Sequence, residues 1–325
     1  MGRSGDDPGL TRAERERLAA LKATTSLADL VALVDAETEH AAYVAAKAEW
    51  SQLRAAELAA TERVARRTAD ADGSQLPGTT VTVDGHDFVV HGITHADTDA
   101  ERSRLRRFEA TLDPDRTTVY CEQGIRPMYF ADRPDVCEMD DYRWAMAACR
   151  ELDVDSHLDD VPDPSFAGLS EEVGRIAGRF REAVFAAIDQ YGRPVDSPVA
   201  ATLGEVASAF FTSHEDLATG EDFEAFRKTR EAATDPTRLR ALQEYYRRTF
   251  LPQPLEREWL CRHDPELEIM THARNERMAE YAVAHNDTSS TVHLLVGAAH
   301  QPGIAYYLRR IRDGTHSMAD FEPMG

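Results

Sequence analysis

The chain contains very little lysine. Lys22, Lys47 and Lys228 are the only lysines among 325 residues, and Lys and Arg together number 37 against 58 Asp and Glu, a formal net charge of -21. A nucleic-acid-binding surface needs clustered positive charge, so we exclude nucleic acid as a partner. A strongly acidic, lysine-poor chain is typical of proteins kept soluble at high salt, and we predict a halophilic protein. The alternative is an ordinary acidic cytosolic protein.

Cysteine is scarce, and long apolar runs are absent. The four cysteines show no C-x-x-C spacing; they are Cys121, Cys137, Cys149 and Cys261. No signal peptide precedes them, so we expect free thiols rather than a disulfide framework. No stretch approaches the roughly 18 apolar residues that suggest a membrane-spanning helix. We therefore predict a soluble, cytoplasmic protein without a membrane partner.

The first 70 residues differ in composition from the rest of the chain. Between Leu10 and about Arg67 they are rich in Ala, Leu, Glu and Arg, which favour helices, and Ser26 is a suitable N-cap. The Pro- and Gly-containing stretch Asp70–Gly78 has the composition of a linker. We predict an N-terminal helical extension (residues 1–70) with a role in packing or in forming a homo-oligomer. Because few contacts cross such a linker, we expect the extension to be separable from the domain that follows.

The chain from residue 79 to 325 alternates strand and helix patterns. Asp84-Gly85 lies between two β-branched runs and predicts a hairpin. Helices are expected at about 99–112 and 140–152, with strands at Thr117–Cys121, around Val154 and at Thr291–Val296. This alternation predicts an α/β domain with a largely parallel sheet. A nearly continuous helical pattern over about residues 170–284 predicts a helical insertion.

Two of the expected strands end in the same motif. Gly92-Ile93-Thr94-His95 follows one apolar run, and Gly297-Ala298-Ala299-His300 follows another. Glu122 occupies the same kind of place after the strand Thr117–Cys121. In α/β sheets ligands bind outside the carboxyl ends of the strands, so we expect these three side chains to converge. His91 is a reserve ligand, because residues four apart on a strand share a face.

The chemistry of this group is open between two alternatives. Two histidines and a carboxylate suit a divalent transition metal with positions left for water, so His95, Glu122 and His300 are predicted metal ligands. A metal-free site would instead use a histidine as general base, oriented by Glu122. Arg126 is a predicted anchor for an oxyanion or a substrate carboxylate, unless it forms a salt bridge with Glu122. Asn275 lies in a polar helix and, if it faces inward, needs a hydrogen-bond partner.

These motifs together resemble the TraB/PrgY/Tiki family, which includes GumN-like proteins and is related to erythromycin-esterase and ChaN-like proteins. The resemblance covers about residues 79–314. The segments that carry it are Gly92–His95, Cys121–Arg126, Arg274–Met278 and Gly297–Ile304, with a weaker match at Glu138–Asp160. The family's C-terminal membrane helices are missing from this chain, and its N-terminal helices are not part of the family pattern.

The resemblance implies an α/β core built around the two G-x-x-H strands. In Tiki-like members it also implies a peptidase that uses a divalent metal, here Mn²⁺, Co²⁺ or Zn²⁺, held by His95, Glu122 and His300. Arg126 and Asn275 would then position a peptide or another small-molecule substrate. We therefore predict a metal-dependent hydrolase. The alternatives are a non-catalytic, peptide-sequestering protein of TraB type and a metal-free, esterase-like hydrolase.

Overall fold

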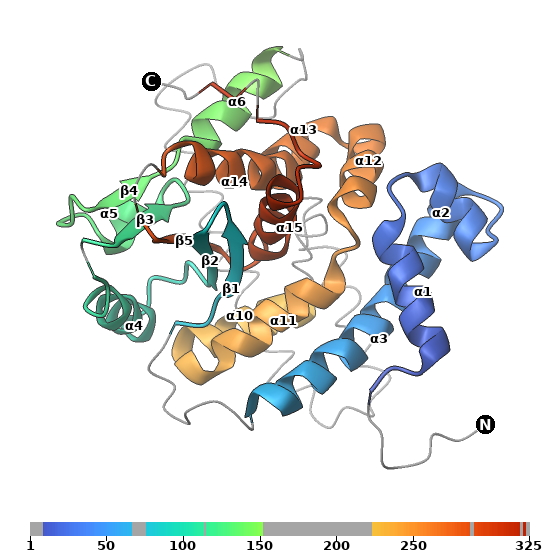
Figure 1. Cartoon of the computed structure of the whole chain (residues 1–325), viewed down its shortest axis with the longest axis horizontal. Helices are drawn as coiled ribbons and strands as arrows, with labels where there is room; N and C mark the ends of the chain where they lie inside the picture. Colours follow the sequence, from blue (N-terminus) through green and yellow to red (C-terminus); the bar gives the residue numbers. More distant parts are fainter. Residues whose placement is uncertain are drawn as a thin grey trace.

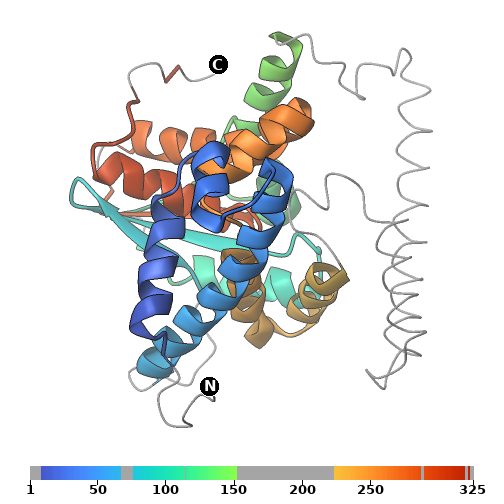
Figure 2. The same ribbon diagram turned by 90° about the vertical axis from the view of Figure 1, so that its right-hand side faces the viewer.

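The computed structural model describes residues 9–66, 76–113, 115–151, 223–286, 289–318 and 321–322. Within them the chain forms three layers, with helices on both faces of a five-stranded sheet (Figures 1 and 2). The strands are β1 (Thr79–Val83), β2 (His86–Ile93), β3 (Thr117–Cys121), β4 (Val136–Glu138) and β5 (Thr291–Gly297). Their order across the sheet is β1-β2-β5-β3-β4, with β1 antiparallel to β2 and the other neighbours parallel. The predicted α/β class and the largely parallel sheet are confirmed.

The hairpin β1–β2 forms where the sequence predicts it. Asp84 and Gly85 both have positive φ, 49° and 86°, which is the backbone of a tight type I′ turn. This turn fixes the register Val83↔His86. Farther along β2 the register pairs Ile93 with Gly297 at the end of β5. The carboxyl ends of these two parallel strands therefore lie side by side.

Each face of the sheet has its own apolar core. On one face, Phe88, Val90 and Leu294 pack with Met278 and Ile304 of two C-terminal helices. These helices are α14 (Arg274–Ala284) and α15 (Gln301–Arg312). The opposite face packs against α4 (Asp99–Glu109), α5 (Ile125–Tyr129), α10 (Phe223–Thr234) and α11 (Leu239–Thr249). A sheet covered on both faces accounts for the continuous apolar runs in its central strands.

The remaining described helices lie beside this core. They are α6 (Asp141–Glu151), η1 (Pro236–Arg238), α12 (Gln253–His263), α13 (Pro265–Glu268) and the π-helical turn η2 (Ile269–Ala273), which leads into α14. Pro236 and the pair Pro252/Pro254 lie at the starts of helices, where proline is tolerated. The predicted strand around Val154 and the insertion before residue 223 lie outside the described residues. Among the described helices, none is long and apolar enough to cross a membrane.

The N-terminal helices α1 (Arg12–Ala23), α2 (Leu27–Val34) and α3 (Glu39–Arg66) pack against the domain. Ser26 caps α2 as predicted, accepting a bond from the amide of Asp29 at 3.1 Å. The apolar core of these helices includes Leu251 and Leu255 from the α11–α12 region. The hydroxyl of Tyr43 also donates to buried Glu256 at 2.6 Å. The extension thus has its own apolar core, and residues of the domain complete it.

Candidate functional site

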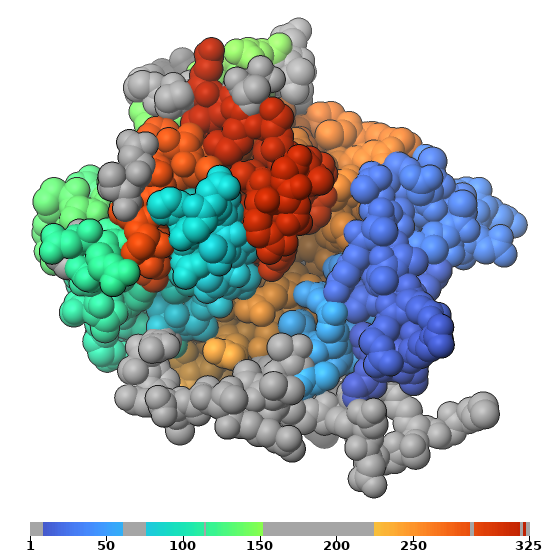
Figure 3. All heavy atoms as spheres, in the orientation of Figure 1, coloured from blue at the N-terminus to red at the C-terminus, as the bar shows by residue number. Residues whose placement is uncertain are grey.

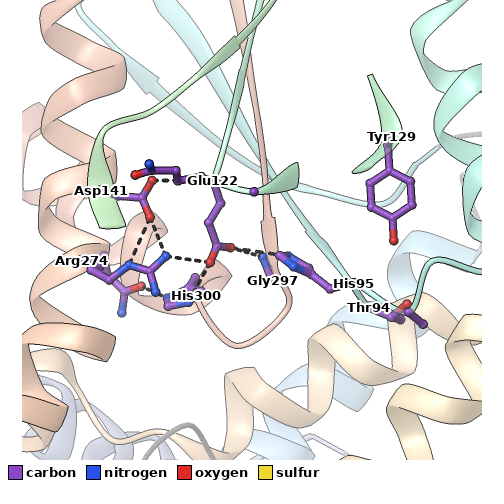
Figure 4. Close-up of polar contacts among 12 residues, drawn as sticks. Thr94, His95, Glu122, Tyr129, Asp141, Arg274, Gly297 and His300 are labelled. Carbon is purple, nitrogen blue, oxygen red and sulfur yellow. Dashed lines mark hydrogen bonds and ion pairs between the residues drawn. The ribbon is translucent and has the colours of Figure 1, made fainter. Parts of the chain in front are cut away.

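The three predicted ligands lie together at one edge of the sheet (Figure 4). His95 follows β2, Glu122 follows β3, and His300 follows β5 at the residue that precedes α15. The Nε2 of His95 lies 3.6 Å from Oε2 of Glu122, and the Nε2 of His300 lies 3.5 Å from its Oε1. The predicted convergence of the strand ends is therefore found in the fold.

Glu122 is buried and strongly held. Its Oε2 accepts a bond from the amide of Gly297 at 2.7 Å, and its Oε1 accepts one from Nη2 of Arg274 at 2.9 Å. Burial alone would raise the pKa of Glu122, but His300, His95, Arg274 and the amide bond outweigh it and lower the pKa to about 2. The carboxylate is therefore ionised at neutral pH.

His300 is held by a chain of amide side chains. Gln253 Oε1 accepts a bond from Nδ2 of Asn275 at 3.2 Å, which turns the Oδ1 of Asn275 toward Nδ1 of His300 at 2.8 Å. Nδ1 must then carry the proton, since an amide oxygen only accepts. Burial lowers the pKa of His300 to about 4, so the ring is neutral at pH 7. The lone pair of its Nε2 therefore faces a carboxylate oxygen, an arrangement of two acceptors that a cation or a proton between them would stabilise.

Gly303 makes room for this chain of bonds. A Cβ on Gly303 would lie 2.3 Å from Nδ2 of Asn275. The glycine three residues after the second motif is thus required by the side chain that orients His300. Asn275 faces inward, with only 2% of the residue exposed, and has the hydrogen-bond partners that an inward-facing asparagine needs.

His95 lies on a tight, strained loop. Its φ is +55°, in the left-handed region that residues other than glycine seldom adopt. The buried carboxylate of Glu101 holds this loop by accepting bonds from the amide and the hydroxyl of Thr94, both at 2.7 Å, and from the amide of Ala96 at 3.0 Å. Tyr129 donates to the same carboxylate at 2.5 Å. The sequence analysis did not identify Glu101. The only feature that could have indicated it is its position as an acidic residue in the first turn of the helix that follows the first motif.

The space between the three side chains is open because residue 297 is glycine. A Cβ built there would lie 3.4 Å from Nε2 of His95, 3.5 Å from Oε2 of Glu122 and 3.5 Å from Cδ2 of His300. The Nε2 of His95 is itself buried and has no hydrogen-bond partner. An unpartnered ring nitrogen, a carboxylate and a second ring nitrogen therefore border one small cradle. Imidazole nitrogens and carboxylate oxygens are ligands that suit a divalent transition metal.

Arg274 is the arginine that contacts Glu122. Its guanidinium also bonds Asp141, with Nε 3.1 Å and Nη2 2.5 Å from Oδ2. Predicted Arg126 does not pair with Glu122; its Nη2 donates to the carbonyl oxygen of Arg133 at 3.4 Å. The alternative salt bridge between Arg126 and Glu122 is therefore replaced by one from Arg274. A helix as polar as the one with Arg274 and Arg277 is usually a surface helix, but both residues are buried against the acidic pair Asp140–Asp141.

His91 does not join the site. Its Nδ1 bonds the carbonyl of Pro77 at 3.1 Å, and its Nε2 faces Nδ1 of His293 at 2.8 Å. Strand β2 ends at Ile93, so the strand alternation that would align His91 with His95 is broken before the motif ends. The reserve-ligand interpretation of His91 is therefore wrong, and the ring belongs to a buried histidine pair.

Another group of metal-ligating side chains lies at the C-terminal end of the described chain. Among the described residues, one set of three potential ligand atoms comes within 4.8 Å of one another, on Glu276, Glu280 and His316. His316 already pairs with Glu280 at 2.8 Å, and Arg257 pairs with Glu276. We interpret this group as an ion-pair network. In the triad formed by His95, Glu122 and His300, by contrast, each histidine faces a different oxygen of Glu122. One shared ion would therefore require these three side chains to move closer together.

Comparisons of the chain with protein-family models, with curated proteins and with solved structures found no match. The resemblance to the TraB/PrgY/Tiki family therefore stays a prediction from sequence motifs.

Proposed function

We propose that the chain is a hydrolase of peptide or ester bonds that uses a divalent metal held by His95, Glu122 and His300. The observation that carries this proposal is the acceptor pair formed by His300 and Glu122. A neutral ring nitrogen faces an ionised carboxylate at 3.5 Å, and the orphaned Nε2 of His95 faces the same group from the other side. A cation bound among these three groups would satisfy all of them once the side chains close in around it.

The chain's own residues would prepare this site in three ways. Asn275 fixes the tautomer of His300, as supporting residues around metal sites commonly do. Glu101 holds the loop that presents His95. Arg274 and Gly297 keep Glu122 ionised, so the carboxylate cannot be neutralised by a proton near pH 7. When bound, a divalent ion supplies Lewis acidity, which lowers the pKa of water and polarises a carbonyl group. Arg126 remains the predicted anchor for the substrate.

A metal-free hydrolase is the second candidate, and Arg274 favours it. The guanidinium already neutralises Glu122 and lies where it would repel a nearby metal cation. Neutral His300 could then accept a proton from water, with its ring held by Asn275. In that case Glu122 would stabilise the imidazolium that forms.

Metal analysis and turnover distinguish these candidates. Purified protein is dialysed with and without a chelator, and its Mn, Co and Zn contents are measured. Hydrolysis of model peptides and esters is then followed before and after each metal is added back. The proposal expects about one ion per chain and turnover that a chelator abolishes and the metal restores. Turnover that survives complete metal removal would support the second candidate. No turnover with or without metal would contradict both candidates and favour a non-catalytic binding protein.

Gly297→Ala offers a sharper test of the cradle. The added methyl meets its neighbours at 3.4–3.5 Å, which is ordinary contact, and Gly297 does not have positive φ. We expect the fold and the melting temperature to change little, while metal binding falls at least about tenfold. Gly303→Ala serves as the contrast, because its methyl collides with Asn275 and should lower the melting temperature. Unchanged metal binding in Gly297→Ala would contradict the site.

A further inference from the structure

A cavity of about 450 Å³ lies between the N-terminal helices and α15. Its walls come from α1, α3, the end of α11, the segment leading into α12, and α15. Figure 3 shows the hollow between α15 (red) and the N-terminal helices (blue). The volume is in the range of small-molecule sites. None of His95, Glu122 and His300 lines this cavity, so it is separate from the proposed catalytic site.

The charge of this cavity is opposite to that of the molecule. Four cationic side chains line it and no carboxylate does; they are Lys22, Arg54, Arg247 and Arg309. In a chain with a net charge of -21, such a group is not expected by chance placement. One of the chain's three lysines is in it. An acidic protein that gathers cations in a recess has a ready site for an anion.

The cationic side chains of this cavity lower one another's pKa values. Burial, followed by repulsion from Arg247 and Arg309, lowers the pKa of Arg54 to about 10. Burial also lowers the pKa of Lys22, with further contributions from Arg54 and Arg309. Bringing like charges together in a partly desolvated place costs free energy. A bound anion would offset that cost.

Two polar groups in the cavity are not used by the fold. The guanidinium of Arg309 is exposed and has no hydrogen bond or ion pair with any residue that the structure describes. The indole Nε1 of Trp50 is buried without a hydrogen-bond partner, and only 6% of the residue is exposed. A buried donor of this kind normally finds an acceptor. By contrast, Lys22 and Arg54 share the single carboxylate of Glu57.

The cavity also has an apolar side. Phe250, Leu251, Pro302 and Ala305 line it, together with the ring of Tyr306. A bare inorganic anion would leave this wall without a partner. The lining therefore suits a ligand with an anionic end and a flat or apolar end.

We propose that this cavity binds a small organic phosphate, with nucleoside diphosphates as the class of ligand that fits it. Arginine recognises phosphate oxygens through paired N–H donors, so Arg309 and Arg247 would bind the phosphate groups. The indole N–H of Trp50 would donate to a phosphate oxygen, and the base would lie against the wall formed by Phe250 and α15. The site is independent of the proposed hydrolase function, although Gln253 lines this cavity and also bonds Asn275.

Calorimetric titration of the full chain tests the proposal with ADP, pyrophosphate and adenosine as probes. All titrations use one salt concentration at which circular dichroism shows the protein folded. We expect ADP to bind with a Kd below about 1 mM, the weaker end of specific small-molecule affinities. Pyrophosphate should bind at least about tenfold more weakly, and adenosine more weakly still. ADP binding no tighter than adenosine, or equal affinity for pyrophosphate and ADP, would overturn the proposal.

Two arginines of α15 provide a matched pair of variants. Both are exposed, but Arg309 lines the cavity, whereas Arg312, one turn later, lies outside it and pairs with Asp313. Arg309→Gln should weaken ADP binding at least about tenfold, the scale of one lost charged hydrogen bond, and Arg312→Gln should leave it within twofold. Trp50→Phe, which removes only the indole donor, should weaken it by a smaller factor. Equal ADP affinity in Arg309→Gln and Arg312→Gln would place any binding elsewhere and overturn the proposal.

Discussion

His95 and His300 face different oxygens of one carboxylate, so neither ring can replace the other. We expect His95→Ala and His300→Ala each to lower metal occupancy and turnover at least about tenfold, because ligands of one ion act as a unit. Metal content and the rate of hydrolysis are measured on the same preparation. The fold should persist, because neither side chain contributes to the apolar cores of the sheet.

His263→Ala is the control for these variants. His263 is exposed on α12 and stacks on Trp259, far in the chain from either motif. It should keep the metal content and rate of the unmodified protein. A folded His95→Ala or His300→Ala protein with full metal content and full rate would rule out the two-histidine site.

The sequence predicted which residues lie at the site better than it predicted what they contact. Strand ends can be read from apolar runs followed by glycine, so His95, Glu122 and His300 were found together. Arg274 was not assigned to the site, because in sequence it differs in no way from Arg126. Only the fold reveals that the π-helical turn η2 precedes it and that Asp141 pairs with it.

At the scale of an element, the loop after β2 depends on one carboxylate from α4. Both oxygens of Glu101 accept bonds from this loop, and an amide in its place would turn one acceptor into a donor that faces N–H groups. Glu101→Gln should therefore destabilise the protein by about 1–3 kcal/mol. It should also weaken metal binding about tenfold by loosening His95. Asp99→Asn, at an exposed position in the same first turn, should change neither quantity.

Denaturant unfolding and metal titration of these two variants measure both effects. The mutation of Glu101 acts on His95 and leaves the bonds of His300 intact, so residual metal binding is expected. If Glu101→Gln unfolds more easily but binds metal as tightly as the unmodified protein, the loop does not position His95.

The paired histidines of β2 and β5 make these strands sensitive to acid. Burial, and then the neighbouring ring, lower the pKa of His91 to about 3, and burial lowers that of His293 to about 4. The unfolded chain, with histidine pKa values near 6.5, therefore binds more protons than the folded one below that pH. The stabilisation is complete above about pH 6.5 and is lost as the pH falls toward 3. Between these values the free energy of unfolding should decrease steadily with decreasing pH.

The double variant His91→Leu/His293→Leu tests this dependence. Without titrating rings, the free energy of unfolding should vary less between pH 7 and pH 4 than in the unmodified protein. His263→Gln removes an exposed histidine and should keep the original slope. Equal slopes in the double variant and the unmodified protein would show that other groups cause the acid sensitivity.

At the scale of the whole molecule, the N-terminal helices pack against the domain although a linker-like segment follows them. Removing residues 1–70 would expose Leu251 and Leu255 and would leave Glu256 without the hydroxyl of Tyr43. The composition of the sequence predicted a separable extension, because composition reveals a polar linker. It does not reveal the contacts between the N-terminal helices and the domain. We now expect the truncated chain to melt at a lower temperature and to bind more of a dye specific for apolar surface. If the truncated chain melts at the same temperature as the full chain, the prediction of a separable extension would be supported again.

The charge of the whole molecule should make its stability depend on salt. Several ion pairs are exposed, such as Arg12–Glu16 with side-chain exposures of 88% and 65%, and contribute little. The 58 acidic residues exceed the 37 basic ones, so repulsion among carboxylates outweighs the attraction that salt also screens. Raising the salt from about 0.1 M to 1 M shortens the screening length from about 10 Å to 3 Å. The melting temperature should therefore rise by several degrees over this range of potassium chloride.

An uncharged solute separates screening from solute exclusion, since both can stabilise a folded protein. Sucrose at matched osmolality should raise the melting temperature less than potassium chloride does, because it leaves carboxylate repulsion unchanged. Sodium chloride should act like potassium chloride, as screening depends on ionic strength and not on the identity of a monovalent cation. A melting temperature that stays flat with both salts, or that rises equally with sucrose, would remove the halophilic interpretation. The triad would be unaffected by that outcome, because its geometry depends on buried contacts that salt screens only weakly.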